Sequence, residues 1–408
     1  MMQGLIAAYK EKTVLPAGGR VPALDGMRFI MVFSVAAFHL WQQSWLTPSI
    51  SLLGLQFSLD PWLRTGYMWV DGMLLLSGFL LYLPFARARE AGRKKPSFSG
   101  FYRRRFLRVF PTYLLNLLAV FFLVALPEGR YASLWEGARD WLAHLSFTHP
   151  FFPFSSVHTP LNGALWTLGV EIQFYLIFPL AARAFARMPL ATYLGFGAAA
   201  FIFRALSIAQ PDTTMLVNQL PAFLDVYLNG FVAAAVFARL ERQTREDGFT
   251  RLFYTAVLFG ALLGLAALVR GQAALGGAES IRVGQMIRRY PQSVLTALAF
   301  IGASLGLGGV RLALGNRAMG WLAAISYQFY MWHQVIALQL KKWRFPPSVS
   351  ENPHMTGERS WQITYLLLSL GLSVLVSALV TFFIEQPLAK RGGRLKGQGG
   401  RKDDRPAG

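Results

Sequence analysis

Residues 28–39 read RFIMVFSVAAFH, in which an arginine and a histidine enclose ten residues that are apolar except for Ser34. In a helix, eleven steps of about 100° return Arg28 and His39 to the same side, about 16 Å apart along the axis. An arginine within an apolar span is costly unless it faces protein or water. The segment therefore predicts a membrane-spanning helix with one polar side that faces a cavity.

The rest of the chain has the same apolar character. Of its 408 residues, 54% are hydrophobic and only 15% are charged, whereas a soluble domain carries about a quarter charged residues. A helix of roughly 20 apolar residues crosses a hydrocarbon core of about 30 Å. The apolar stretches lie at about 21–46, 66–86, 107–127, 163–182, 190–208, 217–238, 252–269, 292–310, 319–340 and 362–384. We expect an all-α transmembrane bundle of about ten helices.

The distribution of basic residues predicts the orientation. With the N-terminus inside, the inner segments hold more than twice as many Lys and Arg as the outer ones, which places both termini in the cytoplasm. The segments 270–290 and 341–361 fit less well, because each is a basic outer loop in this topology. The net charge of +20 is explained by topology, so we expect no nucleic-acid partner.

The chain divides into three parts. Residues 1–20 form a cytoplasmic segment without a recognisable cleavage signal, residues 21–389 form the membrane domain, and residues 390–408 form a basic, glycine-rich tail that we expect to be disordered. The absence of cysteine excludes disulfides and thiolate catalysis. No phosphate-binding glycine loop or H-E-x-x-H motif occurs and the histidines are dispersed, so we expect neither NTP hydrolysis nor a metal.

Arg28 and His39 each have a structural alternative. Arg28 can extend to the membrane interface beside Asp25, and His39 can be a neutral ring hydrogen-bonded between helices. Their shared side favours a functional site instead. Histidine titrates near physiological pH and suits proton abstraction from a hydroxyl, while arginine holds an anion without exchanging a proton.

A basic cluster lies between the second and third spans, in ARAREAGRKKPSFSGFYRRRFLRVFP. In a helix that begins near Ser99, Arg104, Arg105 and Arg108 are three or four residues apart, so their guanidinium groups lie close together. Phosphates are ordinary ligands of such clusters, and we expect a polyanion there. The alternative is a cluster that only sets membrane orientation.

Acidic residues inside spans are further candidates, because an intramembrane carboxylate is functional by default. Glu171 lies in the fourth span between Trp166 and Tyr175, and it would support the site or form a structural ion pair, with Arg28 as one possible partner. Asp225, in the sixth span, has no evident partner or role.

Besides Trp166 and Tyr175, which flank Glu171 and could line the site, five other positions are possible site residues. Ser77 and Gly78 permit close helix packing or contact a ligand. Asp71 lies earlier in the same span, His333 follows an aromatic run in the ninth span, and Glu385 ends the last span. For Glu385 an ion pair with the basic tail is the alternative.

Seven motifs in order resemble one known family, the bacterial integral-membrane acyltransferase-3 proteins, which O-acylate surface polysaccharides, glycolipids and glycosides. The motifs are LDGMR at 24–28, the Arg28–His39 pair, SGF at 77–79, RRFLRVFP at 104–111, LWTLGVEIQFYLIFP at 165–179, ISYQFYMWH at 325–333 and IEQP at 384–387. Some relatives carry a C-terminal SGNH hydrolase-like domain, and residues 1–408 contain no segment like it, so we expect no acyl relay within this polypeptide.

The resemblance implies ten helices in the bacterial inner membrane and transfer of an acyl group, with acetyl favoured, from cytoplasmic acyl-CoA to a carbohydrate or glycolipid hydroxyl. It implies that His39 is catalytic with Arg28 as its partner, that Arg105 and Arg108 hold the CoA phosphates, and that Glu171 supports the site. We place Arg104, Ser77 and Gly78 at the same acyl-CoA site. Acyl-CoA is a co-substrate, and no permanently bound cofactor is expected.

Two other function classes fit the same residues. A transporter or flippase also lines its pathway with buried Arg, His and Glu, and a sensor would bind acylated sugars without turnover. Within the acyltransferase reading, His39 acts as a general base or forms an acyl-histidine. The acceptor and the oligomeric state are not predicted, although the outer loop at 128–162 offers aromatic side chains to a sugar.

Overall fold

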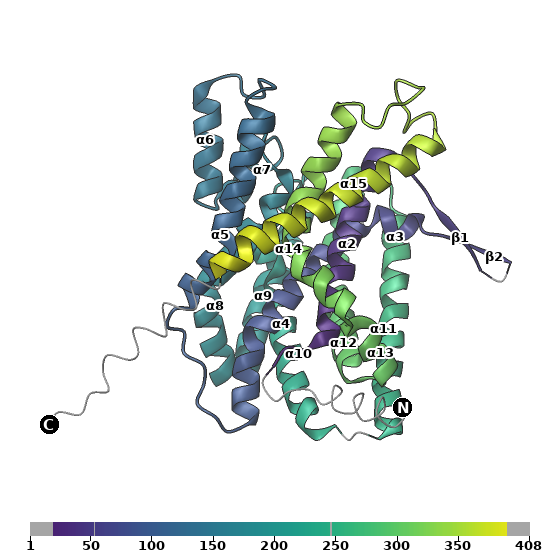
Figure 1. Ribbon diagram of the computed structural model, residues 1–408. Helices are drawn as coiled ribbons and strands as arrows, with labels where there is room; N and C mark the ends of the chain where they lie inside the picture. The colour runs from purple at the N-terminus through teal and green to yellow at the C-terminus, as the bar shows by residue number, and fades with distance from the viewer. Residues whose placement is uncertain (1–18, 53, 245–246, 390–408) are drawn as a thin grey trace.

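The computed structural model describes residues 19–52, 54–244 and 247–389. These residues are almost entirely helical (Figure 1). The long helices are α2 (Pro22–Ser44), α4 (Trp69–Glu90), α5 (Phe101–Val120), α8 (Trp166–Arg187), α9 (Pro189–Ile208), α10 (Leu224–Gln243), α11 (Gly248–Ala273), α12 (Ala278–Leu305), α14 (Arg317–Lys342) and α15 (Arg359–Val380). The N-terminal segment 1–18 and the tail 390–408 lie outside the described residues.

Short elements connect these helices. The strands β1 (Ser49–Leu52) and β2 (Leu55–Ser58) form an antiparallel hairpin that projects from the bundle after α2 (Figure 1). The short helices are α3 (Asp60–Arg64), α6 (Leu134–Leu145), α7 (Pro153–Ser156) and α13 (Gly308–Gly315). The single-turn segments are η1 (Gly66–Met68), η2 (Phe121–Ala125), η3 (His149–Phe151), η4 (Gly163–Leu165), η5 (Leu220–Phe223) and η6 (Thr381–Glu385).

The helices confirm a polytopic membrane protein. Within the described part of the chain, eight helices are long and apolar enough to span a bilayer, and a ninth is counted if α12 and α13, which bend by 107°, form one span. The expected span at 319–340 corresponds to α14, which is not among these candidates. The structure therefore supports eight or nine spans, where the sequence predicted about ten.

The segment 270–290 differs from the expected outer loop. The loop between α11 and α12 is only four residues long, and Arg288 and Arg289 lie inside α12. Arg288 donates to the carbonyl oxygen of Gly271 at 3.1 Å, and Arg289 forms an ion pair with Asp71. These arginines are tolerated in a helix because other helices supply their partners, which the sequence alone does not reveal.

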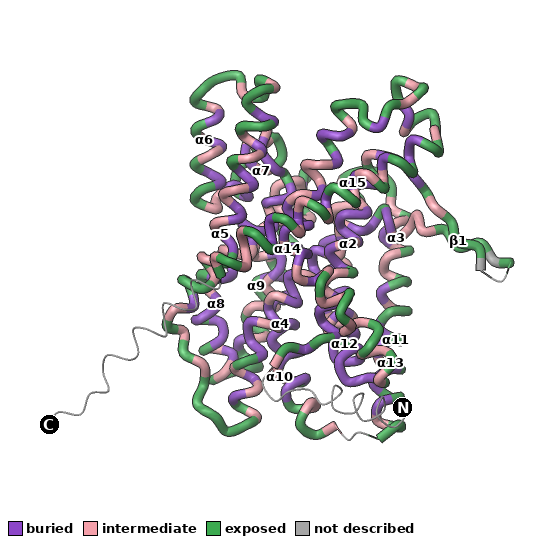
Figure 2. Tube along the Cα trace, in the orientation of Figure 1, coloured by how far each residue is buried: buried purple, intermediate pink, exposed green. Residues whose placement is uncertain are grey.

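Burial separates central from peripheral helices. In the most apolar window of α2, α4 and α10, 67% of the residues are buried, compared with 22% in α9 and α11. Figure 2 shows the same contrast. The peripheral helices present exposed side chains such as Leu194, Phe201 and Leu263, as expected for helices that face lipid. The central helices α2, α4 and α10 position the site.

Two glycines allow α4 and α10 to pack closely. A Cβ atom on Gly78 would lie 2.5 Å from the carbonyl oxygen of Tyr227, and one on Gly230 would lie 2.4 Å from that of Leu75. Each glycine therefore faces the backbone of the other helix, which is the use of small residues expected in membrane bundles. Gly78 is a packing residue here.

Candidate active site

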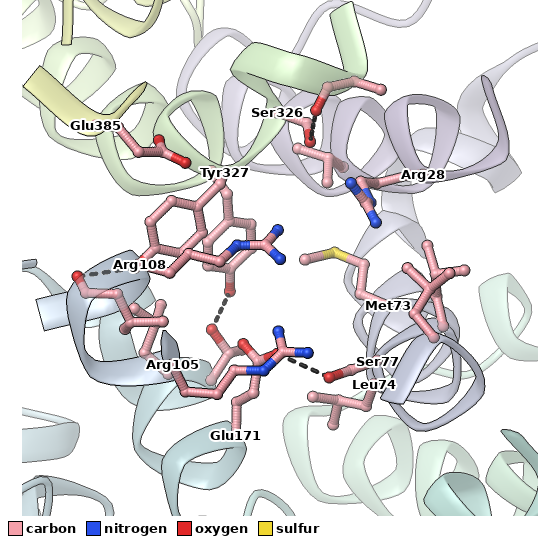
Figure 3. Close-up of a pocket in the computed structure, with 18 of the residues that line it drawn as sticks. Arg28, Met73, Leu74, Ser77, Arg105, Arg108, Glu171, Ser326, Tyr327 and Glu385 are labelled. Atoms are coloured by element: carbon pink, nitrogen blue, oxygen red, sulfur yellow. Dashed lines mark hydrogen bonds between the residues drawn. The ribbon is translucent and has the colours of Figure 1, made fainter. Parts of the chain in front are cut away.

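The first of three cavities, here called the arginine cavity, has a volume of about 290 Å³. It receives Arg28 from α2, Ser77 from α4, Arg105 and Arg108 from α5, and Glu171 from α8. Figure 3 shows the three guanidinium groups extending into the same space, with the Glu171 carboxylate beside them. All five are site residues predicted from the sequence, and the fold brings them together.

The three arginines of this cavity have no ion-pair partner among the described residues. No hydrogen bond or ion pair joins Arg28, Arg105 or Arg108 side chains to another residue within the described part of the chain. Arg105 lies over the ring of Tyr175, with its guanidinium carbon 5.2 Å from the ring centroid. Asp25, which would accompany Arg28 if that side chain extended to the membrane interface, pairs with Arg20 at 2.5 Å. The cavity can therefore accept an anion.

Glu171 is held by neighbours on two helices. Its Oε1 accepts a hydrogen bond from Ser77 Oγ at 2.8 Å and another from Tyr175 Oη, one helical turn later. Tyr175 also lines the cavity, while Glu385 borders it and accepts from Gln328 Nε2 at 2.7 Å. The carboxylate is thus positioned near three cations without being paired to one.

The second cavity, the histidine cavity, has a volume of about 550 Å³ and contains His39. The His39 ring nitrogen Nδ1 lies 3.0 Å from Gln42 Oε1. An amide oxygen only accepts, so Nδ1 carries the hydrogen and Nε2 keeps a free lone pair. Trp166, Tyr67 and Gln219 are among the other lining residues. This arrangement leaves a basic nitrogen available to a ligand.

His333 lies beside His39 from helix α14. The ring centroids are 5.3 Å apart, although His333 is fully buried and lines none of the three cavities. Its Nδ1 is 3.0 Å from the carbonyl oxygen of Phe329 and therefore donates. His333, for which the sequence indicates no partner, thus lies against the candidate base.

Arg28 and His39 do not share one cavity. Arg28 lines the arginine cavity and His39 the histidine cavity, and Val70 and Tyr330 line both. The common side of the helix predicted a single cavity for Arg28 and His39. That prediction is wrong, because the side chains of Val70 and Tyr330 divide the space. Helical periodicity predicts direction, whereas side chains from other helices decide where a cavity is interrupted.

The third cavity, the basic cavity, has a volume of about 780 Å³. It lies between the start of α2 and the C-terminal ends of α4 and α10, and it shares Leu80, Arg28 and Arg108 with the arginine cavity. The three cavities therefore follow one another in the order basic, arginine, histidine, each sharing wall residues with the next.

Arg104 and Asp71 lie elsewhere. Arg104 is exposed and donates to the carbonyl oxygen of Ser99 at 3.2 Å, and it lines none of the three cavities. Asp71 is fully buried and pairs with Arg289, whose Nε is 3.1 Å from Asp71 Oδ2. Asp71 also lies outside the three cavities. The structure thus separates these two residues from the site proposed for them.

A second buried ion pair accounts for Asp225, which had no evident partner in the sequence. Arg204 Nη2 lies 2.6 Å from Asp225 Oδ2. Arg204 and Arg289 both donate to the carbonyl oxygen of Ala222, at 3.0 and 3.5 Å. The carbonyl oxygen of Ala222 therefore links the Arg204–Asp225 and Arg289–Asp71 ion pairs.

Two histidines of the 128–162 segment form a separate buried pair. The His144 and His149 rings stack at 4.5 Å between centroids, and His149 Nε2 donates to the carbonyl oxygen of Leu165 at 3.0 Å. Burial, together with the neighbouring His144, lowers the pKa of His149 from 6.5 to about 3. His149 is therefore neutral at physiological pH and packs as a structural ring.

Sequence reasoning missed three residues of the site. Gln42 fixes the His39 tautomer, and Val70 and Tyr330 separate the two cavities. The signal for Gln42 was present, because it follows His39 by three residues and so lies on the same side of α2. Val70 and Tyr330 had no such signal, since their position depends on how α4 and α14 meet α2.

Comparison with known proteins identifies the family of the chain. The family model described as "Acyltransferase domain" matches residues 21–380. No solved structure matches the chain. The match includes α2, α4, α5, α8 and α14, which supply most of the residues that line the arginine cavity, whereas Thr381, Glu385 and Gln386 follow its end.

Several curated relatives are similar over part of the chain. Acyltransferase MdmB of Streptomyces mycarofaciens is 30% identical over 175 residues, 42% of this chain and 41% of the relative. Peptidoglycan O-acetyltransferase OatA of Listeria monocytogenes is 28% identical over 176 residues, 41% of this chain and 25% of the relative. O-acetyltransferase OatA of Staphylococcus aureus is 27% identical over 169 residues, 39% of this chain and 24% of the relative.

The aligned region thus spans less than half the length of each of these relatives. The family model, in contrast, covers most of the chain. The multiple apolar helices agree with an integral membrane enzyme. The chain therefore belongs to the acyltransferase-3 family.

Proposed function

We propose that the protein transfers an acetyl group from cytoplasmic acyl-CoA to a sugar hydroxyl of a surface polysaccharide, glycolipid or glycoside at the bacterial inner membrane. One observation carries the proposal: the basic, arginine and histidine cavities follow one another through the bundle. A donor with a polyanionic head and a narrow arm that ends in a thioester fits this series. The choice of acetyl as the transferred group and of a carbohydrate as the acceptor follows the names of the O-acetyltransferase relatives.

The arginine cavity suits the donor. Guanidinium groups bind phosphate and carbonyl oxygens through paired N–H donors, and Arg28, Arg105 and Arg108 have no protein partner that competes for them within the described residues. Arg28 lies about 16 Å from His39 along α2. We therefore assign Arg28 to holding the donor, away from the carbonyl carbon that reacts beside His39.

The histidine cavity suits the acceptor. Trp41 and Trp166 supply flat apolar surfaces, and Gln42, Asn218 and Gln219 supply carboxamides. Aromatic rings with a few polar groups are the usual lining of a small-molecule site. A sugar ring stacked in this cavity would direct a hydroxyl toward His39 Nε2.

The reaction needs one proton carrier. His39 Nε2 removes the proton from the acceptor hydroxyl as that oxygen attacks the thioester carbonyl carbon. The carbon–sulfur bond then breaks, and the CoA thiolate takes the proton back from His39. The products are the O-acetyl ester and CoA, and Gln42 Oε1 keeps Nδ1 protonated throughout.

The experiment uses proteoliposomes that contain the purified full-length protein, acetyl-CoA labelled in the acetyl group, and glycan and glycolipid fractions of the host envelope. His39→Gln should lower acetyl transfer by about 10²–10⁴-fold, the usual contribution of a general base. His158→Gln is the matched control, because His158 is exposed and lines none of the three cavities.

Two results would contradict the proposal. Full activity in the His39→Gln variant would exclude His39 as the base, and release of no CoA with any fraction would favour the transporter alternative. Label retained covalently on the protein after denaturation, and lost in His39→Gln, would replace the general-base route with an acyl-histidine.

A further inference from the structure

The basic cavity contains more cationic side chains than its acids neutralise. Its cations are Arg20, Arg28, Arg87, Arg93, Lys94, Arg108 and Arg242, and its acids are Asp25 and Glu241. These residues come from the start of α2 and the residues just before it, the C-terminal end of α4 and the loop that follows it, the C-terminal end of α10, and helix α5. Sequences far apart in the chain therefore build one positive chamber.

Two of these cations are already paired. Arg87 Nη2 donates to Glu241 Oε1 at 2.7 Å, and Arg87 Nε donates to Glu241 Oε2 at 2.9 Å. Arg20 lies 2.5 Å from Asp25. Both acids of the cavity are thereby used within the fold, so they do not compensate the remaining cations.

Five cations remain without a carboxylate partner within the described part of the chain: Arg28, Arg93, Lys94, Arg108 and Arg242. Basic residues after helices α4 and α10 are also favoured by the helix dipole and by membrane orientation. Those effects explain cations at the surface, but they do not require them to surround a chamber of about 780 Å³. Convergence on one chamber points to a polyanionic ligand.

We propose that the basic cavity binds the nucleotide end of the donor, with Arg93, Lys94 and Arg242 on the 3′-phosphate of CoA. The inference rests on the proposed function and deepens it. The diphosphate would then lie near Arg28 and Arg108, which line both the basic and the arginine cavity. From there the pantetheine arm extends into the arginine cavity toward His39.

The assignment has a consequence for donor selection. The nucleotide end of CoA carries a 3′-monoester phosphate and a diphosphate, which together supply about four negative charges at neutral pH. This number approaches that of the five unpaired cations. A phosphopantetheine thioester on a carrier protein has one phosphate and would leave most of them uncompensated, so the site selects CoA thioesters.

The test compares two ligands that differ by one phosphate. Calorimetry of the purified full-length protein in detergent measures the dissociation constants of CoA and 3′-dephospho-CoA. We expect CoA to bind roughly tenfold tighter. The Arg93→Ala/Lys94→Ala double variant and the Arg242→Ala variant should each weaken CoA binding, so that the ratio of the two constants falls toward one.

The controls use nearby arginines at the C-terminal ends of α4 and α10. Arg89→Ala on α4 and Arg239→Ala on α10 remove exposed positive charges that do not line the basic cavity, and the ratio should stay near tenfold. The affinity for 3′-dephospho-CoA should be unchanged in every variant, which also shows that each variant is folded.

The outcomes separate this inference from the proposed function. Equal binding of CoA and 3′-dephospho-CoA by the unaltered protein overturns the phosphate assignment but leaves acyl-CoA as donor, whereas binding of neither overturns the proposed function. A lipid headgroup is the other source of phosphate. The lipid alternative predicts that phosphatidylglycerol vesicles lower CoA affinity in the unaltered protein but not in the Arg93→Ala/Lys94→Ala variant. It also predicts that the ratio of the CoA and 3′-dephospho-CoA dissociation constants is the same in both proteins. These two results together would identify the chamber as a lipid site and overturn the assignment.

Discussion

Two sets of arginines in this protein differ in their partners. Arg204 and Arg289 lie between helices with Asp225 and Asp71 as ion-pair partners. Arg28, Arg105 and Arg108 face the arginine cavity without an ion pair to any residue that the structure describes. We call the first set the paired arginines and the second the open arginines.

The contrast separates structural from functional charge. A buried cation is tolerated when a carboxylate and hydrogen-bond acceptors surround it, and removing either partner leaves an uncompensated charge. A cation that faces a cavity keeps its donors for a ligand. The paired arginines should therefore determine stability, and the open arginines should determine donor binding and turnover.

The largest expected effect concerns the paired set. Arg289→Met leaves Asp71 buried without its cation, and we expect a loss of about 3–5 kcal/mol in the free energy of unfolding. Unfolding in mixed detergent micelles measures it. The Asp71→Leu/Arg289→Met double variant removes both charges and should recover most of the stability. A single variant as stable as the unaltered protein would contradict a structural role for the pair.

The open set should respond in the opposite way. Arg28→Ala should lower acetyl transfer by about 10²–10³-fold, as for loss of one preorganised electrostatic contact. Stability should be unchanged, because no protein partner of Arg28 within the described residues loses its cation. The measurements are the transfer rate and the unfolding midpoint in the same detergent.

The matched control for this prediction is Arg103→Ala. Arg103 is exposed, lies on the same helix as Arg105, and lines none of the three cavities. Its removal should change neither measurement. An Arg28→Ala protein that unfolds as readily as Arg289→Met would remove the distinction between the two sets.

The smallest predicted effect extends the comparison to His149, a buried histidine that stacks on His144. Burial lowers the pKa of His149 to about 3, while the unfolded chain binds the proton near pH 6.5. Between these values the unfolded state holds one more proton, so stability falls as the pH falls, approaching about 1.4 kcal/mol per pH unit. Above pH 6.5 this contribution is constant.

Unfolding of the unaltered protein and of His149→Gln between pH 7 and 4 tests this linkage. The variant should lose most of the slope, whereas His158→Gln, which changes an exposed histidine, should retain it. An unchanged slope in His149→Gln would show that other groups control the acid sensitivity.

The sequence by itself predicted the helical membrane fold, the family, and seven residues of the arginine cavity: Arg28, Ser77, Arg105, Arg108, Glu171, Tyr175 and Glu385. These conclusions depend on local pattern. Apolar stretches of about 20 residues predict spans, and the eleven-residue spacing of Arg28 and His39 predicts a common helix side. Such regularities arise within one segment and need no knowledge of its neighbours.

The tertiary structure decided which charges are paired and where the cavities divide. Asp71 and Arg289 are 218 residues apart, and the pairing of Asp225 with Arg204 likewise joins separate helices. Val70 and Tyr330 separate Arg28 from His39 because α4 and α14 pack against α2. Periodicity gives each side chain a direction, but only the packing of several helices determines what that side chain meets.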